Sequence, residues 1–464
     1  MTPTILHRKT DQHDLTASLY YGDDVRTTLR SFPDKSIHLV CTSPPYWGLR
    51  DYLTGEWVGG DISCDHEQGR DGCGRADGQV DERGQRNRDG AIALTKGVCS
   101  KCGAIRVDSQ IGLEPTPEEY VQHLVEVFQE IGRVLRDDGL VYLNLGDTYW
   151  GGGSTTTYGQ DPRNFSEKST LGGVYTEGQA DRPIKPRAHP RLKVKDLIGV
   201  PWMVAFALRD AGWFLRQDCI WQKTNGMPSP AYDRFVSSHE YIFMLSKKAR
   251  YYFDCDAVSE LVENPGKPRA FRDAKDHAAG TLRQDNGRMY LPQEKRFKRS
   301  VWTLSTQPFR GAHFATWPQA LVEPMILSGT SEVGCCAECG TPYRRIIEKI
   351  GGRDWREDEM VTIGIPGELS GEGPYKRGRS REPLNDVQKR VTKGWEKTCR
   401  CPCTKTMPCT VLDPFSGSGT TGHVAFQLGR NYIGIDLNEG YLSLAKERIL
   451  GYEEGSLLDI LSME

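Results

Sequence analysis

The sequence predicts an α/β fold, because a strand, turn, helix, strand unit lies near its end and a buried strand lies near its start. Residues 410–412 form a short β-rich run, a Gly-Ser-Gly turn follows at 417–419, and residues 420–428 have a helical pattern. A second β-rich run at 431–436 completes the unit. The early strand is the apolar run 39–41. At 464 residues, 37% of them hydrophobic, the chain can bury one large α/β core and smaller modules.

The late glycine turn has the features of a cofactor-binding loop. Gly417 and Gly419 tolerate positive φ angles and let a ligand lie close to the backbone. Asp436, at the end of the second strand, is placed to accept hydrogen bonds from a ribose diol, which suits a cofactor without a phosphate there. A phosphate-binding loop is disfavoured because it needs a Lys before its Ser or Thr, whereas Gly419 is followed by Thr420. A plain turn between two core strands is the alternative for this motif alone.

The early strand ends in the segment Thr-Ser-Pro-Pro-Tyr-Trp at 42–47. Prolines lack the donor that a strand ladder needs, and ligand sites of open α/β sheets lie at such strand ends. The Ser43 hydroxyl and the proline-fixed carbonyls can accept hydrogen bonds from an exocyclic amino group, while Tyr46 and Trp47 offer flat faces for its ring. Acceptors on both N–H bonds favour a tetrahedral nitrogen, which points its lone pair at an electrophilic methyl group. A Pro-Pro turn with aromatic packing is the alternative for the segment alone.

In this order, the two motifs resemble those of the amino-directed DNA methyltransferases that use S-adenosylmethionine, in the circularly permuted arrangement that puts the catalytic motif first. The resemblance implies a Rossmann-like class I methyltransferase fold, and it covers most of the chain apart from polar inserts. Further segments that resemble the family lie at 21–24, 132–144, 220–225, 239–243 and 313–318. Each is a weak pattern, and their order is the specific signal.

The resemblance also implies roles for individual residues. The catalytic residues would be Ser43, Pro44, Pro45 and Tyr46. The cofactor-binding residues would be Asp23, Thr42, His313, Phe314, Thr316, Asp413, Pro414, Phe415, Gly417, Ser418, Gly419, Thr420, Thr421 and Asp436. In the family the segment matching Asp23 contacts the cofactor adenine, and the segment at His313 closes over its methionine end. The methyl group would transfer in line to a base flipped out of the duplex, with no covalent enzyme intermediate.

The residue before Pro-Pro-Tyr predicts the target amino group. A Ser there is more typical of enzymes that methylate cytosine N4, whereas an Asp is more typical of adenine N6 enzymes. Cytosine presents a ring-nitrogen acceptor beside its amino donor, which suits a hydroxyl that both accepts and donates. Methylation of the ring carbon is disfavoured because it needs a thiol just after a proline, and Cys41 precedes the motif. Cytosine N4 in duplex DNA is therefore the prediction, with adenine N6, a methyltransferase on RNA or a protein amide, and an inactive zinc-dependent DNA-binding protein as alternatives.

The 14 cysteines are clustered, and clusters in a cytosolic setting indicate zinc more than disulfides. The first predicted ligand set is Cys64, His66, Cys99 and Cys102, with Cys73 as a rival for the fourth position. The second set is Cys336, Cys339, Cys399 and Cys401, with Cys403 as a substitute. Both zinc ions would be structural, because four protein ligands leave no position for a catalytic water. Reduced thiols without a metal are the alternative.

These assignments divide the chain into core segments and inserts. The core is expected at 15–63 with the catalytic motif, 111–255 with a polar loop at 151–190, 301–334 with the cofactor-closing segment, and 410–464 with the glycine turn. Zinc-binding inserts are expected at 64–110 and 335–409. The basic insert 256–300 is the expected target-recognition region, because the family places that region just before the segment at His313. A solvated charged loop is the alternative.

Composition limits the partners and the location. A net charge of −2 predicts that any DNA-binding surface is local. No apolar run is long enough to span a membrane, and residues 1–4 lack a signal-peptide pattern, so a cytoplasmic enzyme is expected. The expected macromolecular partner is double-stranded DNA, and a restriction endonuclease would be a functional partner if the enzyme belongs to a restriction-modification pair.

Overall fold

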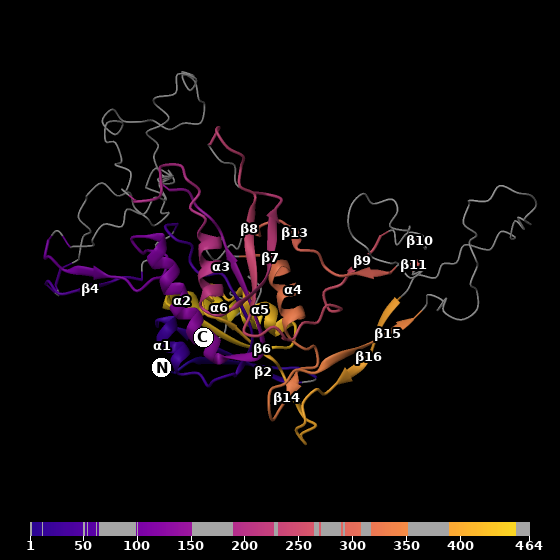
Figure 1. Cartoon of the computed structure of the whole chain (residues 1–464). Helices are drawn as coiled ribbons and strands as arrows, with labels where there is room; N and C mark the ends of the chain where they lie inside the picture. Colours follow the sequence, from indigo (N-terminus) through magenta and orange to yellow (C-terminus); the bar gives the residue numbers. More distant parts are fainter. Residues whose placement is uncertain are drawn as a thin grey trace, which may run out of the picture.

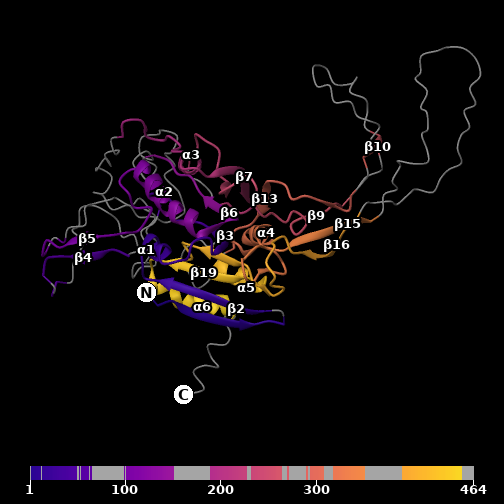
Figure 2. The same cartoon turned by 60° about the horizontal axis from the view of Figure 1, so that its bottom comes forward.

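The computed structural model describes residues 2–11, 13–49, 52, 54–61, 63–64, 99, 101–150, 189–226, 231–263, 269–270, 289–290, 293–307, 317–350 and 389–451. These residues form a large sheet with helices on both faces and small strand pairs beyond it (Figures 1 and 2). This arrangement confirms the predicted α/β class.

The central sheet has nine strands. Their spatial order is β1 (Thr4–Lys9), β2 (Asp14–Tyr21), β19 (Asn431–Asp436), β18 (Thr410–Asp413), β3 (Ile37–Thr42), β6 (Leu135–Leu145), β8 (His239–Ser246), β7 (Phe214–Lys223) and β13 (Val301–Leu304). The five strands from β2 to β6 are parallel, β8 runs antiparallel to both of its neighbours, and β1 is antiparallel to β2. The sheet is therefore mostly parallel, as in doubly wound α/β folds.

The middle of the sheet joins the two ends of the sequence. Val411 of β18 pairs with Leu39 of β3, and Leu412 pairs with Val40. Parallel neighbours end at the same edge of a sheet, so the Ser-Pro-Pro-Tyr segment and the glycine turn emerge side by side. This pairing explains how two motifs at opposite ends of the sequence can form one site.

Both faces of the sheet are buried under helices. One face carries α1 (Val25–Arg30), α2 (Pro117–Val134) and α3 (Val200–Asp210), and the other carries α4 (Gln319–Gly329), α5 (Thr420–Gln427) and α6 (Leu442–Leu450). Figure 2 shows α2 and α3 on one side of the sheet and α5 and α6 on the other. Successive strand residues alternate between the faces: Val40 joins the first core, whereas Leu39 and Cys41 join the second. The apolar run at residues 39–41 of β3 follows from this double burial.

Helix α2 shows how local sequence sets an element that supports the site. The Thr116 side chain accepts a hydrogen bond from the Glu119 N–H and caps the helix, and Pro117 occupies its first turn. Tyr120, Leu124, Val127, Phe128 and Ile131 recur at helical spacing and are buried against the sheet. The buried face holds α2 against β6.

Small strand pairs lie outside the sheet. They are β4 (Glu56–Val58) with β5 (Ile105–Val107), β9 (Glu260–Leu261) with β12 (Lys295–Arg296), β10 (Arg269–Ala270) with β11 (Met289–Tyr290), β14 (Cys335–Cys336) with β17 (Thr406–Met407), and β15 (Arg344–Ile350) with β16 (Lys389–Glu396). Figure 1 shows β15 and β16 leaving the core beside β9. Arg390 of β16 makes a bidentate ion pair with Asp256, at 2.5 and 2.8 Å. The β15–β16 hairpin is thereby fastened to the base of the 256–300 segment.

Candidate active site

A cleft of about 600 Å³ opens at the edge of the sheet where β3, β6, β18 and β19 end. Two loops that are far apart in sequence line it. One supplies Ser43 to Tyr46, and the other supplies Asp413 to Ser418. Further lining residues include Asp24, Asn144, Trp221, Lys223, Glu240, Trp317, Asp436, Asn438 and Tyr441. The structure therefore brings the two predicted motifs into one cavity.

The two glycines of the late turn serve different purposes. Both have positive φ angles, +50° at Gly417 and +76° at Gly419. A Cβ atom at Gly417 would meet nothing within 4 Å, whereas one at Gly419 would lie 3.1 Å from the Cα and Cβ of Ala445 in α6. Gly417 therefore leaves room on the cleft side, and Gly419 permits close helix packing.

The Asp436 carboxylate closes this turn. Its oxygens accept hydrogen bonds from the Gly417 N–H at 2.7 Å and the Asn438 N–H at 2.9 Å. A carboxylate offers about four lone-pair sites, so acceptor capacity remains for a ligand in the cleft. Burial raises the pKa of Asp436 to about 6. At neutral pH it is mostly an ionised acceptor.

Asp413 is a buried carboxylate of the cleft, and two predicted cofactor-binding residues donate hydrogen bonds to it. Thr42 and Thr421 donate hydroxyl hydrogen bonds to its two oxygens at 2.7 and 2.6 Å, and the Phe415 N–H donates at 3.1 Å. Burial raises the pKa of Asp413 to about 6 despite these donors. Both threonines are buried and lie behind the cleft lining. Their position indicates that they hold Asp413 in place.

The early turn ends in a network of side-chain oxygens. The Tyr46 hydroxyl lies 2.7 Å from Glu240 Oε2 and 3.0 Å from Asn144 Oδ1, and Ser43 Oγ lies 3.3 Å from the same Asn144 oxygen. Lys223 donates to Glu240 Oε1 and pairs with its charge. Burial, with the nearby Glu240 charge, raises the pKa of Tyr46 well above its usual value. The phenol is therefore a neutral donor in the physiological pH range.

Trp47 corrects one expectation. Its side chain is only 6% exposed, its indole N–H donates to the Glu114 carbonyl, and its ring stacks on Trp150 with the centroids 5.9 Å apart. It belongs to the core on the α2 face and does not line the cleft. The prediction that Trp47 offers a face to the substrate ring is wrong, because the chain turns this side chain inward after Tyr46.

Residues 37–337 and 406–447 match the family described as DNA methylase, the N6 and N4 amino-methyltransferases. The chain belongs to this DNA methylase family. It is 30% identical over 446 residues to the Type II methyltransferase M.Cfr9I of Citrobacter freundii, an alignment that covers 96% of this chain and 92% of the relative. It is 29% identical over 427 residues to the Type II methyltransferase M.SmaI of Serratia marcescens, with 92% and 89% covered. The predicted family membership is confirmed.

Several cleft residues of this DNA methylase were not among the predicted site residues. Asp24 lines the cleft, whereas Asp23 does not. Glu240, Lys223 and Asn144 lie inside segments that matched the family, yet nothing in those segments marked them out from their neighbours. His313, Phe314 and Thr316 lie outside the described residues.

The structure gathers both predicted cysteine groups. The four Sγ atoms of Cys336, Cys339, Cys399 and Cys401 all lie within 4.8 Å of one another, as do those of Cys64, Cys99 and Cys102. His66 and Cys73, the candidates for the fourth position of the smaller group, lie outside the described residues. Cys403 is not part of the four-cysteine group. The donor set of that group is the Cys₄ set of tetrahedral structural zinc sites.

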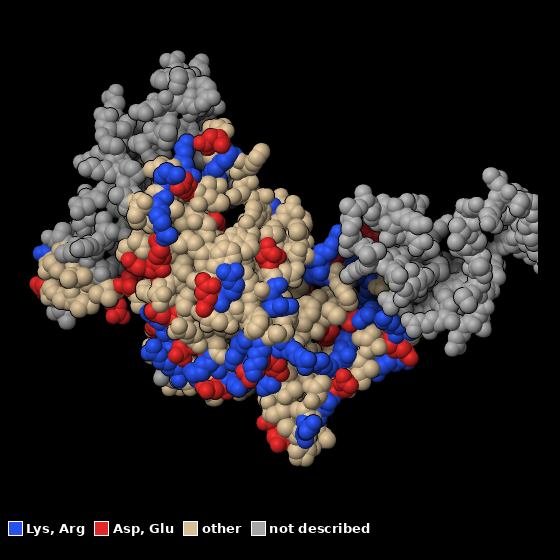
Figure 3. Space-filling view, in the orientation of Figure 1, with Lys and Arg blue, Asp and Glu red and all other residues tan. Residues whose placement is uncertain are grey.

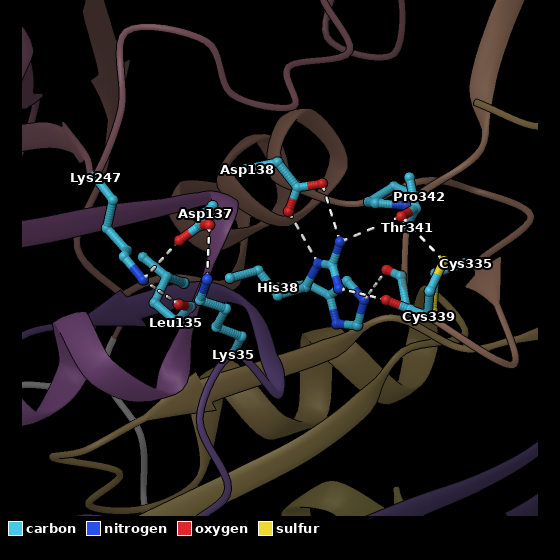
Figure 4. A network of polar contacts seen from close by, with 12 residues as sticks. Lys35, His38, Leu135, Asp137, Asp138, Lys247, Cys335, Cys339, Thr341 and Pro342 are labelled. Atoms are coloured by element: carbon cyan, nitrogen blue, oxygen red, sulfur yellow. Dashed lines mark hydrogen bonds and ion pairs between the residues drawn. The ribbon is translucent and has the colours of Figure 1, made fainter. Parts of the chain in front are cut away.

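The four-cysteine group is fastened to the edge of the sheet opposite the cleft, where β3, β6 and β18 begin. Figure 4 shows His38 and Cys339 at this edge. The Thr410 N–H donates to His38 Nδ1 at 3.0 Å, so Nε2 carries the proton and donates to the Gly340 carbonyl at 2.8 Å. Arg136, near the start of β6, donates to the Cys339 carbonyl at 2.8 Å. His38, Cys335 and Cys409 also cluster, but both His38 ring nitrogens are already hydrogen-bonded. His38 is therefore a structural bridge and not a metal ligand.

Basic and acidic side chains form ion pairs on this opposite edge. Figure 3 shows Lys and Arg side chains in a band across the lower part of the view, with Asp and Glu among them. Lys35, Lys247 and Lys248 converge on Asp137, with N–O distances of 2.9 to 3.2 Å. These ion pairs hold the pKa of Asp137 well below its usual range, the hydrogen bond from Lys35 first among them.

Within the described part of the chain, no helix combines the length and apolar content needed to span a bilayer.

Proposed function

We propose that this DNA methylase transfers a methyl group from S-adenosylmethionine to the N4 amino group of cytosine at a specific site in duplex DNA. The observation that carries the proposal is the neutral Ser43 hydroxyl, held beside Asn144 and Tyr46, in the same cleft as the glycine turn. Adenine N6 is the second candidate, because the family includes both amino targets.

The cleft residues fit S-adenosylmethionine. Asp436 keeps acceptor capacity for a ribose diol, and the open space at Gly417 lets the nucleoside lie against the turn. Trp317 and Tyr441 line the cleft and offer aromatic surface. When bound there, the cofactor supplies an electrophilic methyl group. Thr42, Thr421 and the Phe415 N–H contribute indirectly, because they orient Asp413 at the junction of the two loops.

The early turn would orient the target base. Flipping the base from the duplex costs a few kcal/mol, which stacking on the Tyr46 ring helps to offset. Ser43 Oγ and the Pro44 carbonyl would accept the two amino N–H bonds and pull the nitrogen toward a tetrahedral shape. These hydrogen bonds strengthen as the nitrogen changes geometry, so they favour the transition state over the bound substrate.

The cysteine groups and the recognition insert complete the proposal. Two structural zinc ions would occupy the groups at Cys336 and Cys64 and brace the inserts that carry them. The segment 256–300 would contact DNA. The ion pair between Asp256 and Arg390 would hold the start of this segment against the β15–β16 hairpin. Type II methyltransferases such as the relatives are named for restriction-modification systems, so a restriction endonuclease of the same specificity is the proposed functional partner.

Nucleoside mass spectrometry of methylated duplex DNA tests the function. Incubation with labelled S-adenosylmethionine should yield N4-methylcytosine. Tyr46→Ala should lose most turnover, by roughly 1 to 3 kcal/mol through lost base stacking, and should keep cofactor affinity in calorimetry. Ser43→Ala should lower the rate more than it weakens DNA binding. Methylcytosine modified at the ring carbon, or full activity in both variants, would overturn the proposal, and N6-methyladenine would select the second candidate.

A further inference from the structure

An amino group that receives a methyl group must lose a proton, and Ser43 cannot keep it. The nitrogen lone pair forms the new N–C bond, and the electron pair of the broken S–C bond stays on sulfur. The nitrogen is then cationic until one N–H proton leaves. A serine hydroxyl accepts a proton only if it passes its own proton on at once, so a site built on Ser43 requires an outlet.

The cleft holds such an outlet. Ser43 Oγ lies 3.4 Å from the Tyr46 hydroxyl, and that hydroxyl lies 2.7 Å from Glu240 Oε2. The first distance is long for a hydroxyl pair, as is common for catalytic hydrogen bonds before the substrate binds. Asn144 Oδ1 also accepts from these hydroxyls, but an amide oxygen is a poor proton acceptor. Glu240 is the carboxylate at the end of the chain of hydroxyls.

We propose that Ser43, Tyr46 and Glu240 form the path by which the methylated amino group loses its proton. This inference rests on the proposed function. The amino proton moves to Ser43 Oγ, the serine proton moves to the Tyr46 oxygen, and the tyrosine proton moves to Glu240 Oε2. The products are a neutral methylamino base and a protonated Glu240, which later releases its proton to solvent.

The surroundings of Glu240 suit this task. Each of its two carboxylate oxygens has a different donor: Lys223 on β7 donates to Oε1, and Tyr46 donates to Oε2. The Glu240 side chain is only 13% exposed, and Tyr46 is among the partly buried residues packed on the core. Further titratable groups that line the cleft include His239 and Tyr241 on its own strand, Asp147 beyond β6, and the carboxyls of Asp24, Asp413 and Asp436. Lys223 is the cation paired with Glu240, and it balances the charge before the proton arrives.

A rival role for Glu240 is simply to hold the Tyr46 ring in position. Glu240→Gln separates the two roles, because a glutamine oxygen still accepts the Tyr46 hydrogen bond but cannot take its proton. The proton path predicts at least a tenfold lower single-turnover rate in Glu240→Gln, with unchanged affinity for cofactor and for duplex DNA. Tyr46→Phe, which keeps the stacking ring, should lose a similar factor. The double variant should be no slower than the slower single variant, because both changes interrupt one path.

The pH profile gives a readout that a positioning role would not move. At saturating cofactor, the acid limb of the wild-type rate profile should be missing in Glu240→Gln. Glu114→Gln is the matched control, since Glu114 is a buried carboxylate that accepts from the Gly112 N–H and contacts His123 outside the cleft. A wild-type rate in Glu240→Gln, an unchanged acid limb, or additive losses in the double variant would overturn the proton path. Absence of any amino-methylated product from the wild type would instead refute the proposed function.

Discussion

The two ends of the central strands use polar side chains in opposite ways. Where β3 and β6 begin, His38 makes hydrogen bonds to two backbone groups, and Arg136 donates to the Cys339 carbonyl and pairs with Asp138. These contacts join the four-cysteine segment to the sheet. Where the same strands end, Ser43 and Asn144 face a cleft and keep capacity for a ligand. The residues that stabilise the fold therefore lie at the start of each strand, and the residues that face the ligand lie at its end. Changes at one end should therefore alter unfolding, and changes at the other should alter binding and rate.

The largest effect is expected from the four-cysteine group. Cys399→Ser should lower the zinc content from about two to about one per chain and reduce the free energy of unfolding by more than about 4 kcal/mol, the scale of losing a structural metal site. Cofactor affinity should stay unchanged below the melting temperature, because the group lies at the edge opposite the cleft. Elemental analysis, thermal melting and calorimetry measure the three quantities.

Cys403→Ser is the matched control, because Cys403 lies in the same loop outside the group. It should change neither zinc content nor melting. Purified protein that contains no zinc and melts unchanged after chelation would refute the metal assignment. A variant with normal stability but lost cofactor binding would break the separation of the two edges.

A smaller loss of stability is expected from His38→Ala. The change leaves the Thr410 N–H and the Gly340 carbonyl without their side-chain partner. Each unsatisfied group should lower the free energy of unfolding by about 1 to 3 kcal/mol. Denaturant unfolding measures the total, and calorimetry should again find normal cofactor affinity. His7→Ala on the exposed face of β1 is the control and should be neutral. An equal effect of the two substitutions would show that His38 does not bridge the segments.

The smallest effect is expected from pH at the cleft edge. Asp436 has a pKa raised to about 6, so it is an ionised acceptor above that pH and a neutral acid below it. Cofactor affinity should therefore fall by about tenfold per pH unit below 6, close to 1.4 kcal/mol for each unit. Stability should move the other way, because a raised carboxyl pKa stabilises the fold in acid and this contribution is lost as pH rises through 6.

Asp436→Asn isolates this carboxyl from Asp413, whose pKa is also about 6. Its cofactor affinity should be lower at pH 8 and nearly flat between pH 5 and 8. Calorimetry across that pH range, on the wild type and on Asp436→Asn, measures both affinities. A wild-type affinity that does not change with pH would remove Asp436 from the cofactor site.

The sequence by itself determined the fold class, the family and the order of the two motifs. Local patterns were sufficient there: the apolar run before Ser43, the Gly-Ser-Gly turn and the strand that ends at Asp436 each show their nature over a few residues. The spacing of Cys336, Cys339, Cys399 and Cys401 also predicted a group that the structure brings together.

Only the tertiary structure decided which side chains meet. The pairing of β18 with β3 sets the two loops side by side, and the register of β8 against β6 and β7 places Glu240 beside Tyr46 and Lys223. The same packing turned Trp47 into the core and aimed Thr42 and Thr421 at Asp413. A strand residue faces the cleft or the core according to its register across the sheet, and a shift of one residue reverses that choice. Register depends on contacts between separate segments of the chain, so no local pattern contains it.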